Sequence, residues 1–296
     1  MARSARCKIK RAAILAGLAS LLAAIPATAI KLRAQAPQGK AAASFEVFTV
    51  RYGVSRDFKV SSLAVGADPS RTTDVPFMFW VLKNRGDRNI LVDAGCYRGP
   101  DFEKWKLSDF IKPSIAIGKV GLQPDQITDI IITHIHWDHM NGVDLFPKAR
   151  VWIQRDEFDH YVDAGGKPRF DAIGSDDAAM LMNLQKSGRL TLVDGDALEI
   201  IPGITVYTGG KHTYSVQYVG VKTTAGTVVV ASDNIYMYEN LEKQLPLGLT
   251  EDRDADLRAQ ARMLKIASSP RLILPGHDPA VFERFPKPGD GVARIE

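Results

Sequence analysis

Four side chains able to bind a metal ion lie within six consecutive residues, in the order His134-x-His136-x-Asp138-His139. They directly follow the apolar run at 129–132, which predicts a buried strand. Imidazole nitrogens and carboxylate oxygens are both good ligands for Zn²⁺ and similar divalent metals. Four ligands on so short a piece of backbone do not fit comfortably around one tetrahedral ion. The spacing therefore predicts two neighbouring ions that share one loop.

Three further candidate ligands, His212, Asp233 and His277, each stand where an apolar strand gives way to a loop. Ligands from distant segments can converge at the edge of a sheet, because the rigid sheet fixes their positions. A single histidine in such a place is more often an ordinary surface or core residue. Five of the six histidines share this context, so chance is a poor explanation; His160, within a polar helix, is the exception.

In order and spacing, these seven residues resemble the metal-binding pattern of the metallo-β-lactamase-fold hydrolases. The resemblance covers about residues 45–285 and implies an α/β (α+β) fold, a four-layer αββα sandwich with two metal ions along one edge. It implies two ligand sets, His134, His136 and His212 for one metal and Asp138, His139 and His277 for the other, with Asp233 bridging them. Asp93 matches an acidic residue that precedes the motif in the family, and it would orient a ligand imidazole.

Among these hydrolases, the N-acyl-homoserine lactonase branch is the most similar, because its members carry a tyrosine three residues after the bridging aspartate. Tyr236 stands at that place and would hydrogen-bond the substrate carbonyl or the departing alkoxide. The alternative is a tyrosine that packs at the edge of the sandwich. One difference is plain: Thr213-Tyr214-Ser215 follows His212, without the Pro-Gly that is usual in the family.

The resemblance implies that a hydroxide bridging the two metals opens the lactone ring, with Asp138 and Tyr236 as catalytic residues. Zn²⁺ is the expected metal, with iron, manganese and cobalt as alternatives. Cys96 is expected to be structural, since nothing near it in the sequence stabilises a thiolate. Three other functions stay open: another exported dinuclear-zinc esterase, phosphotriesterase or β-lactamase; a mononuclear iron dioxygenase that acts on persulfides; and a metal-free binding module.

Residues 1–29 predict a secretory signal peptide. Five basic residues come first, then the apolar run 12–25, then the small residues Ala27-Thr28-Ala29. The run is too short for a comfortable transmembrane span. A second small-residue site, Ala34-Gln35-Ala36, places cleavage as late as residue 36. We therefore expect a periplasmic or secreted protein that is not inserted in the membrane after cleavage.

Removal of the signal peptide changes which partners the charge favours. It leaves 33 basic and 34 acidic residues, so a nucleic-acid partner loses its electrostatic support. Cys96 is then the one remaining cysteine, which excludes an internal disulfide. We expect the partner to be a small lactone or ester, with a homodimer as an open question.

The remaining residues must form the elements that position the site. Residues 30–44 predict a flexible lead-in, and 45–296 a single catalytic domain. Apolar or alternating runs predict strands at 45–52, 75–83, 89–93, 127–133, 151–154, 190–193, 197–201, 204–208, 215–223, 227–232 and 271–274. Helices are predicted at 101–112, 155–164 and 252–268. Strands followed by a helix, twice, indicate two related halves stacked sheet against sheet.

Residues 165–189, which are rich in glycine and methionine, predict an insertion over the site. Together with the loop after Asp233, this insertion is expected to select the substrate. The residues expected to offer apolar surface to an acyl chain are Trp137, Met140, Phe170, Ile173, Met180, Met182, Met237 and Tyr238.

Overall fold

The computed structural model describes residues 44–86 and 88–296. The signal peptide and the lead-in up to residue 43 lie outside the described residues, so both stay predictions. Among the described helices, none combines the length and the apolar character that a membrane span requires.

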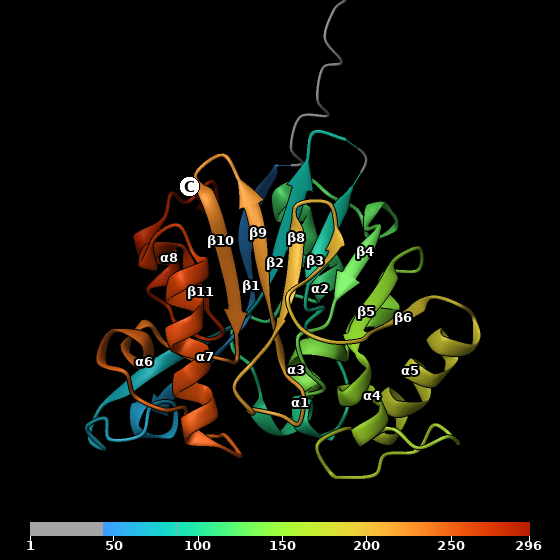
Figure 1. Ribbon diagram of the computed structural model, residues 1–296, viewed down its shortest axis with the longest axis horizontal. Helices are drawn as coiled ribbons and strands as arrows, with labels where there is room; N and C mark the ends of the chain where they lie inside the picture. The colour runs from blue at the N-terminus through green and yellow to red at the C-terminus, as the bar shows by residue number, and fades with distance from the viewer. Residues whose placement is uncertain (1–43, 87) are drawn as a thin grey trace, which may run out of the picture. The chain divides into compact units, whose positions relative to one another are not determined.

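Two β-sheets pack face to face, with helices on their outer sides (Figure 1). The larger sheet has the strand order β12-β1-β2-β3-β4-β5-β6, and the smaller has the order β11-β10-β9-β8-β7. The strands are β1 (Phe45–Lys59), β2 (Thr72–Asn84), β3 (Asn89–Val92), β4 (Asp129–Ile131), β5 (Arg150–Gln154), β6 (Leu190–Val193), β7 (Leu198–Ile201), β8 (Ile204–Thr208), β9 (Gln217–Thr223), β10 (Gly226–Ser232), β11 (Ile273–Pro275) and β12 (Val292–Ile295). The α-helices are α1 (Pro100–Trp105), α2 (Pro113–Ala116), α3 (Trp137–Met140), α4 (Arg155–Tyr161), α5 (Ser175–Lys186), α6 (Tyr238–Lys243), α7 (Arg253–Ile266) and α8 (Val281–Arg284).

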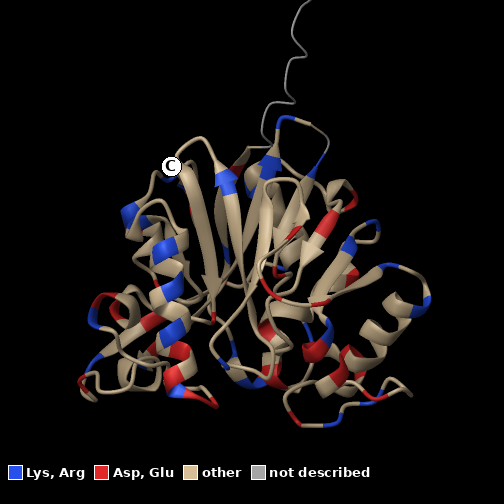
Figure 2. Cartoon of the chain, in the orientation of Figure 1, with Lys and Arg blue, Asp and Glu red and all other residues tan. Residues whose placement is uncertain are grey.

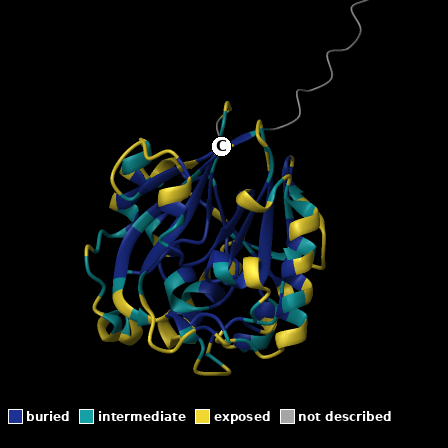
Figure 3. Cartoon of the chain, turned by 90° about the vertical axis from the view of Figure 1, so that its left-hand side faces the viewer, coloured by how far each residue is buried: buried dark blue, intermediate teal, exposed yellow. Residues whose placement is uncertain are grey.

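Three separate groups of buried apolar side chains hold the four layers together. Trp80 of β2 and Val219 of β9 belong to the group between the sheets. Phe79, the neighbour of Trp80, points to the opposite face and joins a second group with Leu181 of α5. Met263 of α7 joins the third group, on the outer face of the smaller sheet. Figure 3 shows buried strands inside and exposed positions on the outer helices. The predicted αββα sandwich is confirmed.

Charged side chains gather on the helices and loops, while most of the strand length is free of them (Figure 2). This distribution fits strands that are covered on both faces, since a charge buried there would need a partner.

The strand directions bring the loops of interest to one edge of each sheet. In the larger sheet, β3, β4, β5 and β6 are parallel neighbours. In the smaller sheet, β10 is parallel to β11, and β8 runs in the same direction because both are antiparallel to β9. Parallel strands end at the same edge. Residues that follow β3 and β4 therefore meet, as do residues that follow β8, β10 and β11.

The predicted strands are present, with differences in length and number. β1 continues seven residues beyond the predicted end at residue 52 and pairs along β2. β12 was not predicted; it is a short strand near the C-terminus that pairs with β1. The predicted helix at 101–112 is wrong beyond Trp105, because Lys106 adopts a left-handed conformation (φ 45°) and Ser108 pairs with Val54.

Candidate metal centre

The seven predicted ligands converge at one edge of the sandwich. The structure groups their ligand atoms as His134, His136 and His212; as His134, His139 and Asp233; and as Asp138, His139 and His277, with the atoms of each group within 4.8 Å of one another. We call His134, His136 and His212 the three-histidine half of the centre, and Asp138, His139 and His277 the carboxylate half.

The backbone around the centre adopts conformations that most residues avoid. Asp93, Lys211 and Ser232 have left-handed φ angles of 63°, 65° and 48°. Lys211 precedes His212 and Ser232 precedes Asp233, so the strained residues stand next to candidate ligands. Gly276 allows a close approach of the loop carrying His277, because a Cβ atom there would lie 2.2 Å from Asp233 Oδ1. Strain of this kind persists only where surrounding contacts hold it, and it concentrates at functional sites.

The three-histidine half presents imidazole nitrogens to one another. His136 Nδ1 lies 3.2 Å from His134 Nε2 and 3.0 Å from His212 Nε2. Two nitrogens bound to one tetrahedral Zn²⁺ through bonds of about 2.0–2.1 Å stand about 3.3–3.4 Å apart. The observed spacing is therefore close to that of three ligands around one ion.

The carboxylate half pairs two imidazoles with Asp138. Asp138 Oδ2 lies 3.3 Å from His139 Nε2 and 3.6 Å from His277 Nε2. Both rings face the carboxylate with the same nitrogen. This geometry suits a second ion with mixed nitrogen and oxygen ligands.

Asp233 stands between the two halves. Its Oδ2 atom lies 3.7 Å from His134 Nε2, 3.4 Å from His212 Nε2 and 3.3 Å from His139 Nε2. Its Oδ1 atom lies 3.3 Å from His277 Nε2. One carboxylate thus faces ligands of both halves, which is the position that a bridging ligand needs.

Four of the five imidazoles are oriented by a contact at their other nitrogen. His134 Nδ1 lies 3.0 Å from Thr133 Oγ1, and His139 Nδ1 lies 2.8 Å from Asp93 Oδ2. Two more Nδ1 atoms face backbone carbonyls, that of His212 at Leu249 O (2.9 Å) and that of His277 at Pro76 O (3.1 Å). A carbonyl oxygen can only accept, so these two rings donate from Nδ1 and turn Nε2 to the centre. Contacts of this kind raise the basicity of a ligand and fix its tautomer.

Asp93 connects the ligand loops to one another. Its carboxylate accepts hydrogen bonds from the Thr133 backbone N–H (2.8 Å), the Thr133 hydroxyl (2.9 Å) and the Ser232 hydroxyl (2.9 Å), besides its contact with His139. Asp93 is fully buried. Sequence reasoning placed Asp93 near a ligand imidazole but missed Thr133 and Ser232, because a serine or threonine at a strand end carries no distinctive signal.

Burial and charge separate the two halves. Burial lowers the pKa of His134 and of His212, and it lowers that of His136 to about 3, so these rings are neutral. Burial acts in the same direction on His139 and His277, but the carboxylates of Asp138 and Asp233 outweigh it and raise the pKa of both rings. The carboxylate half therefore attracts a positive charge more strongly.

Two buried polar atoms support a cation at this place. His139 Nε2 and Asp233 Oδ1 are shielded from solvent and, beyond the ion-pair contacts given above, have no hydrogen-bond partner among the described residues. A buried polar atom without a partner costs about 1–3 kcal/mol. Both atoms point into the centre and both are good metal ligands, so the donor set fits divalent ions.

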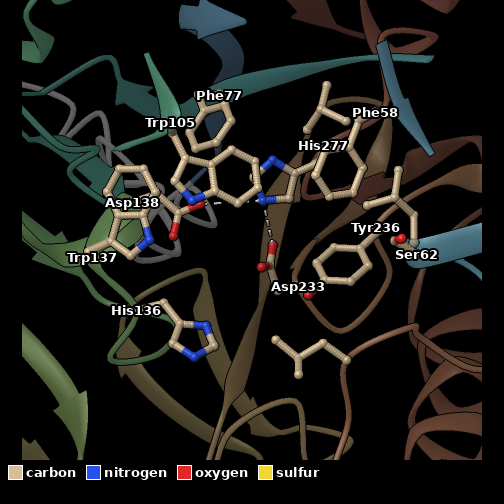
Figure 4. A pocket seen from close by; sticks show the side chains of 13 residues that line it. Phe58, Ser62, Phe77, Trp105, His136, Trp137, Asp138, Asp233, Tyr236 and His277 are labelled. Atoms are coloured by element: carbon tan, nitrogen blue, oxygen red, sulfur yellow. Dashed lines mark ion pairs between the residues drawn. The ribbon is translucent and has the colours of Figure 1, made fainter. Parts of the chain in front are cut away.

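A cavity of about 270 Å³ opens beside the centre (Figure 4). Asp138, Asp233 and His277 form its polar end, and Figure 4 marks the ion pairs between them. Its walls are largely aromatic and aliphatic, formed by Phe58, Leu63, Val75, Phe77, Trp105, Trp137, Tyr236 and Leu249. Trp105 stacks on Phe58 with 5.5 Å between ring centroids. None of the described residues lining the cavity is a lysine or an arginine.

The expectation that residues 165–189 shape the cavity was wrong, whereas the loop after Asp233 does line it through Tyr236. Residues 165–189 do not line the cavity, because α5 packs its buried side chains against the larger sheet instead. Of the apolar residues expected at the mouth, Trp137 alone lines it. Met140, Ile173, Met182, Met237 and Tyr238 are buried in the core, and Phe170 and Met180 lie elsewhere. Phe58, Leu63, Val75 and Phe77 come from β1, the segment after it and β2, which carry no chemical motif, and Trp105 comes from the end of α1.

Tyr236 lies at the edge of both the cavity and the centre. Its hydroxyl oxygen is 3.3 Å from His212 Nδ1, and its backbone carbonyl accepts the His277 N–H at 3.0 Å. Burial, together with the charges of Asp233 and Asp138, raises its pKa well above the usual value. The phenol therefore keeps its proton and can donate it in a hydrogen bond.

Comparison with known proteins is consistent with this geometry. The sequence profile of the metallo-beta-lactamase superfamily matches residues 77–277. Human metallo-beta-lactamase domain-containing protein 1 is 29% identical over 64% of this chain and 58% of its own length, so the chain spans little more than half of that relative. An N-acyl homoserine lactonase of Bacillus thuringiensis is 26% identical over 74% of this chain and 87% of its own length.

Solved structures show the same fold. One is an N-acyl homoserine lactone hydrolase with the product N-hexanoyl-L-homoserine bound at its catalytic metal centre. It superposes with a TM-score of 0.68 at 20% identity, covering 86% of this chain and all of the other.

Proposed function

The chain belongs to the metallo-beta-lactamase superfamily and is a hydrolase of that superfamily; from this premise we propose that it opens the lactone ring of N-acyl-homoserine lactones. Two divalent ions, with Zn²⁺ as the first candidate, would complete the site, one in each half and both beside Asp233. The lactonases among its relatives support this substrate.

The cavity is the observation that carries the proposal. Its polar end is the candidate metal centre, and its walls are apolar without a basic side chain among the described lining residues. A β-lactam carries a carboxylate, for which such a wall offers no countercharge. A neutral lactone with an apolar acyl chain can place its ester at the polar end and its chain along the aromatic wall.

The residues of this chain would divide the chemistry as follows. Bound divalent ions supply Lewis acidity and lower the pKa of water in contact with them. Asp138 lines both the centre and the cavity, so its carboxylate can accept a proton from the attacking water and return it to the leaving oxygen. The Tyr236 hydroxyl can donate a hydrogen bond to the oxygen that gains negative charge, as an oxyanion donor does.

The test is a side-by-side measurement with metal-replete protein. Proton release on ring opening of N-acyl-homoserine lactones is followed at constant pH, next to hydrolysis of paraoxon and of a cephalosporin. We expect the lactones to be turned over fastest. Absence of lactone hydrolysis by protein that holds its metals would refute the proposal, and faster paraoxon turnover would favour a phosphotriesterase. One iron per chain with sulfur-dependent oxygen uptake would favour a persulfide dioxygenase.

We also propose that the protein acts outside the cytoplasm, after removal of residues 1–29. The order of basic, apolar and small residues in that segment supports export. Amino-terminal sequencing of the protein from the periplasm or the medium should find a first residue between positions 30 and 37. An intact Met1 in the mature protein would contradict it.

A further inference from the structure

Glu157 is a fully buried carboxylate that belongs to neither half of the centre. Its Oε1 atom accepts the backbone N–H of Ile135 at 3.0 Å, and its Oε2 atom accepts that of Ser215 at 2.6 Å. Ile135 lies between His134 and His136, and Ser215 lies three residues after His212. One side chain of α4 therefore holds the two loops that carry all three ligands of the three-histidine half.

Burying a carboxylate is costly unless its oxygens are hydrogen-bonded. No lysine or arginine among the described residues forms an ion pair with Glu157, so backbone N–H groups stabilise it instead. An apolar side chain would avoid the burial of a carboxylate but would leave both backbone N–H groups without this acceptor. The carboxylate is explained by the two loops that it joins.

The same face of α4 contacts the second loop twice more. Tyr161, four residues after Glu157 and thus on the same side of the helix, accepts the Tyr214 N–H at its hydroxyl oxygen (3.2 Å). The imidazole of His160 stacks on the ring of Tyr214 with 3.9 Å between centroids and 1° between planes. Within the loop itself, the Lys211 ammonium lies 4.4 Å from the centroid of the Tyr214 ring. The loop is therefore held through residues that occupy the place of the missing Pro-Gly.

The carboxylate half has no contact of this kind with α4. His139 is oriented by Asp93, and His277 is oriented by the carbonyl of Pro76. The backbone carbonyl of Asp138 accepts a hydrogen bond from the Tyr52 hydroxyl at 2.8 Å. These partners lie on β1, on β2 and after β3.

We propose that Glu157 is a positioning residue for the three-histidine half alone, which sets the distance between the loops at 134–136 and 212–215. The inference rests on the proposed function only in that the three histidines hold an ion. Loss of the carboxylate should weaken one of two metal sites and leave the other as it is.

The experiment is a stepwise Co²⁺ titration of metal-free protein, followed by absorbance and by metal content per chain. In Glu157→Gln, the amide nitrogen cannot accept, so one backbone N–H loses its partner. We expect binding of one Co²⁺ to weaken about 10–100-fold, as for other residues that orient ligands, while the other step stays unchanged. Asp156→Asn, at an exposed position of the same helix, makes the same change of charge and should titrate like the wild type.

Two reference variants identify the half that is lost. Singly loaded Glu157→Gln should give the absorption spectrum of singly loaded His136→Ala, not that of His277→Ala. Equal weakening of both steps, or no weakening in a folded variant, would overturn the inference. If Glu157→Gln does not fold, Tyr161→Phe is titrated in its place. We expect the same Co²⁺-binding step to weaken, by a smaller factor. Unchanged Co²⁺ binding in Tyr161→Phe would also overturn the inference. A wild type that binds fewer than two ions would instead refute the dinuclear proposal, and this inference with it.

Discussion

Apart from the contact between Thr133 and His134, the three-histidine half of the centre is positioned from outside the strand ends, whereas the carboxylate half is positioned largely from within them. In the first half, α4 and the carbonyl of Leu249 hold the loops and the ring of His212. In the second half, Asp93 at the end of β3 binds His139 directly and also binds Ser232 at the end of β10.

The charges of the halves differ in the same way. Burial leaves the imidazoles of the first half neutral, while carboxylates raise the pKa of the two imidazoles in the second. A ligand must lose its proton before it binds a metal, so protons compete with metal binding up to a higher pH in the second half than in the first. The short motif at 134–139 therefore supplies ligands to two halves that are positioned by different elements.

Replacement of Asp233 tests what the halves share. Asp233→Ala removes the one carboxylate that faces ligands of both, so we expect both ions to bind more weakly and hydrolysis to fall on the order of 10³-fold or more, since the metals supply most of the charge stabilisation. Metal content and lactone turnover are measured together. Asp171→Ala, at an exposed position away from the cavity, is the control. Unchanged activity of Asp233→Ala would point to a protein that does not use this centre.

Tyr236 contacts both halves, yet we expect it to serve the substrate rather than either metal. Tyr236→Phe removes a hydroxyl that lies near His212 Nδ1, whose carbonyl partner Leu249 remains. Two metals per chain should therefore be retained, while kcat falls about 10²-fold, as for loss of one oxyanion donor. A drop in metal content with kcat per metal unchanged would assign the hydroxyl to the three-histidine half.

Asp93→Asn should weaken metal binding in the carboxylate half, as Glu157→Gln should in the three-histidine half. Four donor groups converge on the Asp93 carboxylate, and an amide nitrogen would oppose at least one of them. We expect a loss of about 3 kcal/mol in unfolding free energy and about 10–100-fold weaker metal binding. The weakened step should be the one that stays intact in Glu157→Gln. If both variants weaken the same step, the two halves are not positioned separately.

The ligands could be predicted from the sequence because each lies at the end of an apolar strand, and strand ends are fixed by the sheet. The same reasoning failed for the cavity. Phe58 of β1, Phe77 of β2 and Trp105 at the end of α1 form its wall through contacts with one another, and large aromatic residues usually signal core. Glu157 could not be distinguished from its neighbours Asp156 and Asp159, because hydrogen bonds to distant backbone leave no trace in local composition. Residues 165–189 misled for the opposite reason, since their composition resembles a loop while their middle forms α5.

Replacement of Asp256 on α7 should have the smallest effect on the centre. It tests whether residues beyond α4 also position the three-histidine half. Asp256 is fully buried, and its Oδ2 atom accepts the Leu247 N–H at 2.9 Å. Leu247 precedes by two residues the carbonyl of Leu249 that orients His212. Burial raises the pKa of Asp256 to about 7 from an ordinary value of 3.8. The folded protein therefore binds this proton more tightly than the unfolded chain does.

The sign of the pH effect follows from that difference. Below about pH 4 the carboxyl is protonated in both states and contributes nothing, and its contribution to stability falls as the pH rises toward 7. Asp256→Asn lacks this titration, so its unfolding free energy relative to wild type should increase between about pH 4 and pH 7, by up to about 4 kcal/mol, and then level off. Urea unfolding at a series of pH values measures the difference, with metal content as the second readout. We expect two metals per chain throughout, because a second contact holds the backbone next to Leu249. The N–H of Gly248 donates to Leu63 O at 3.1 Å. A difference that is flat with pH would show that the Asp256 carboxyl titrates normally, and loss of one metal would extend the positioning of the three-histidine half to α7.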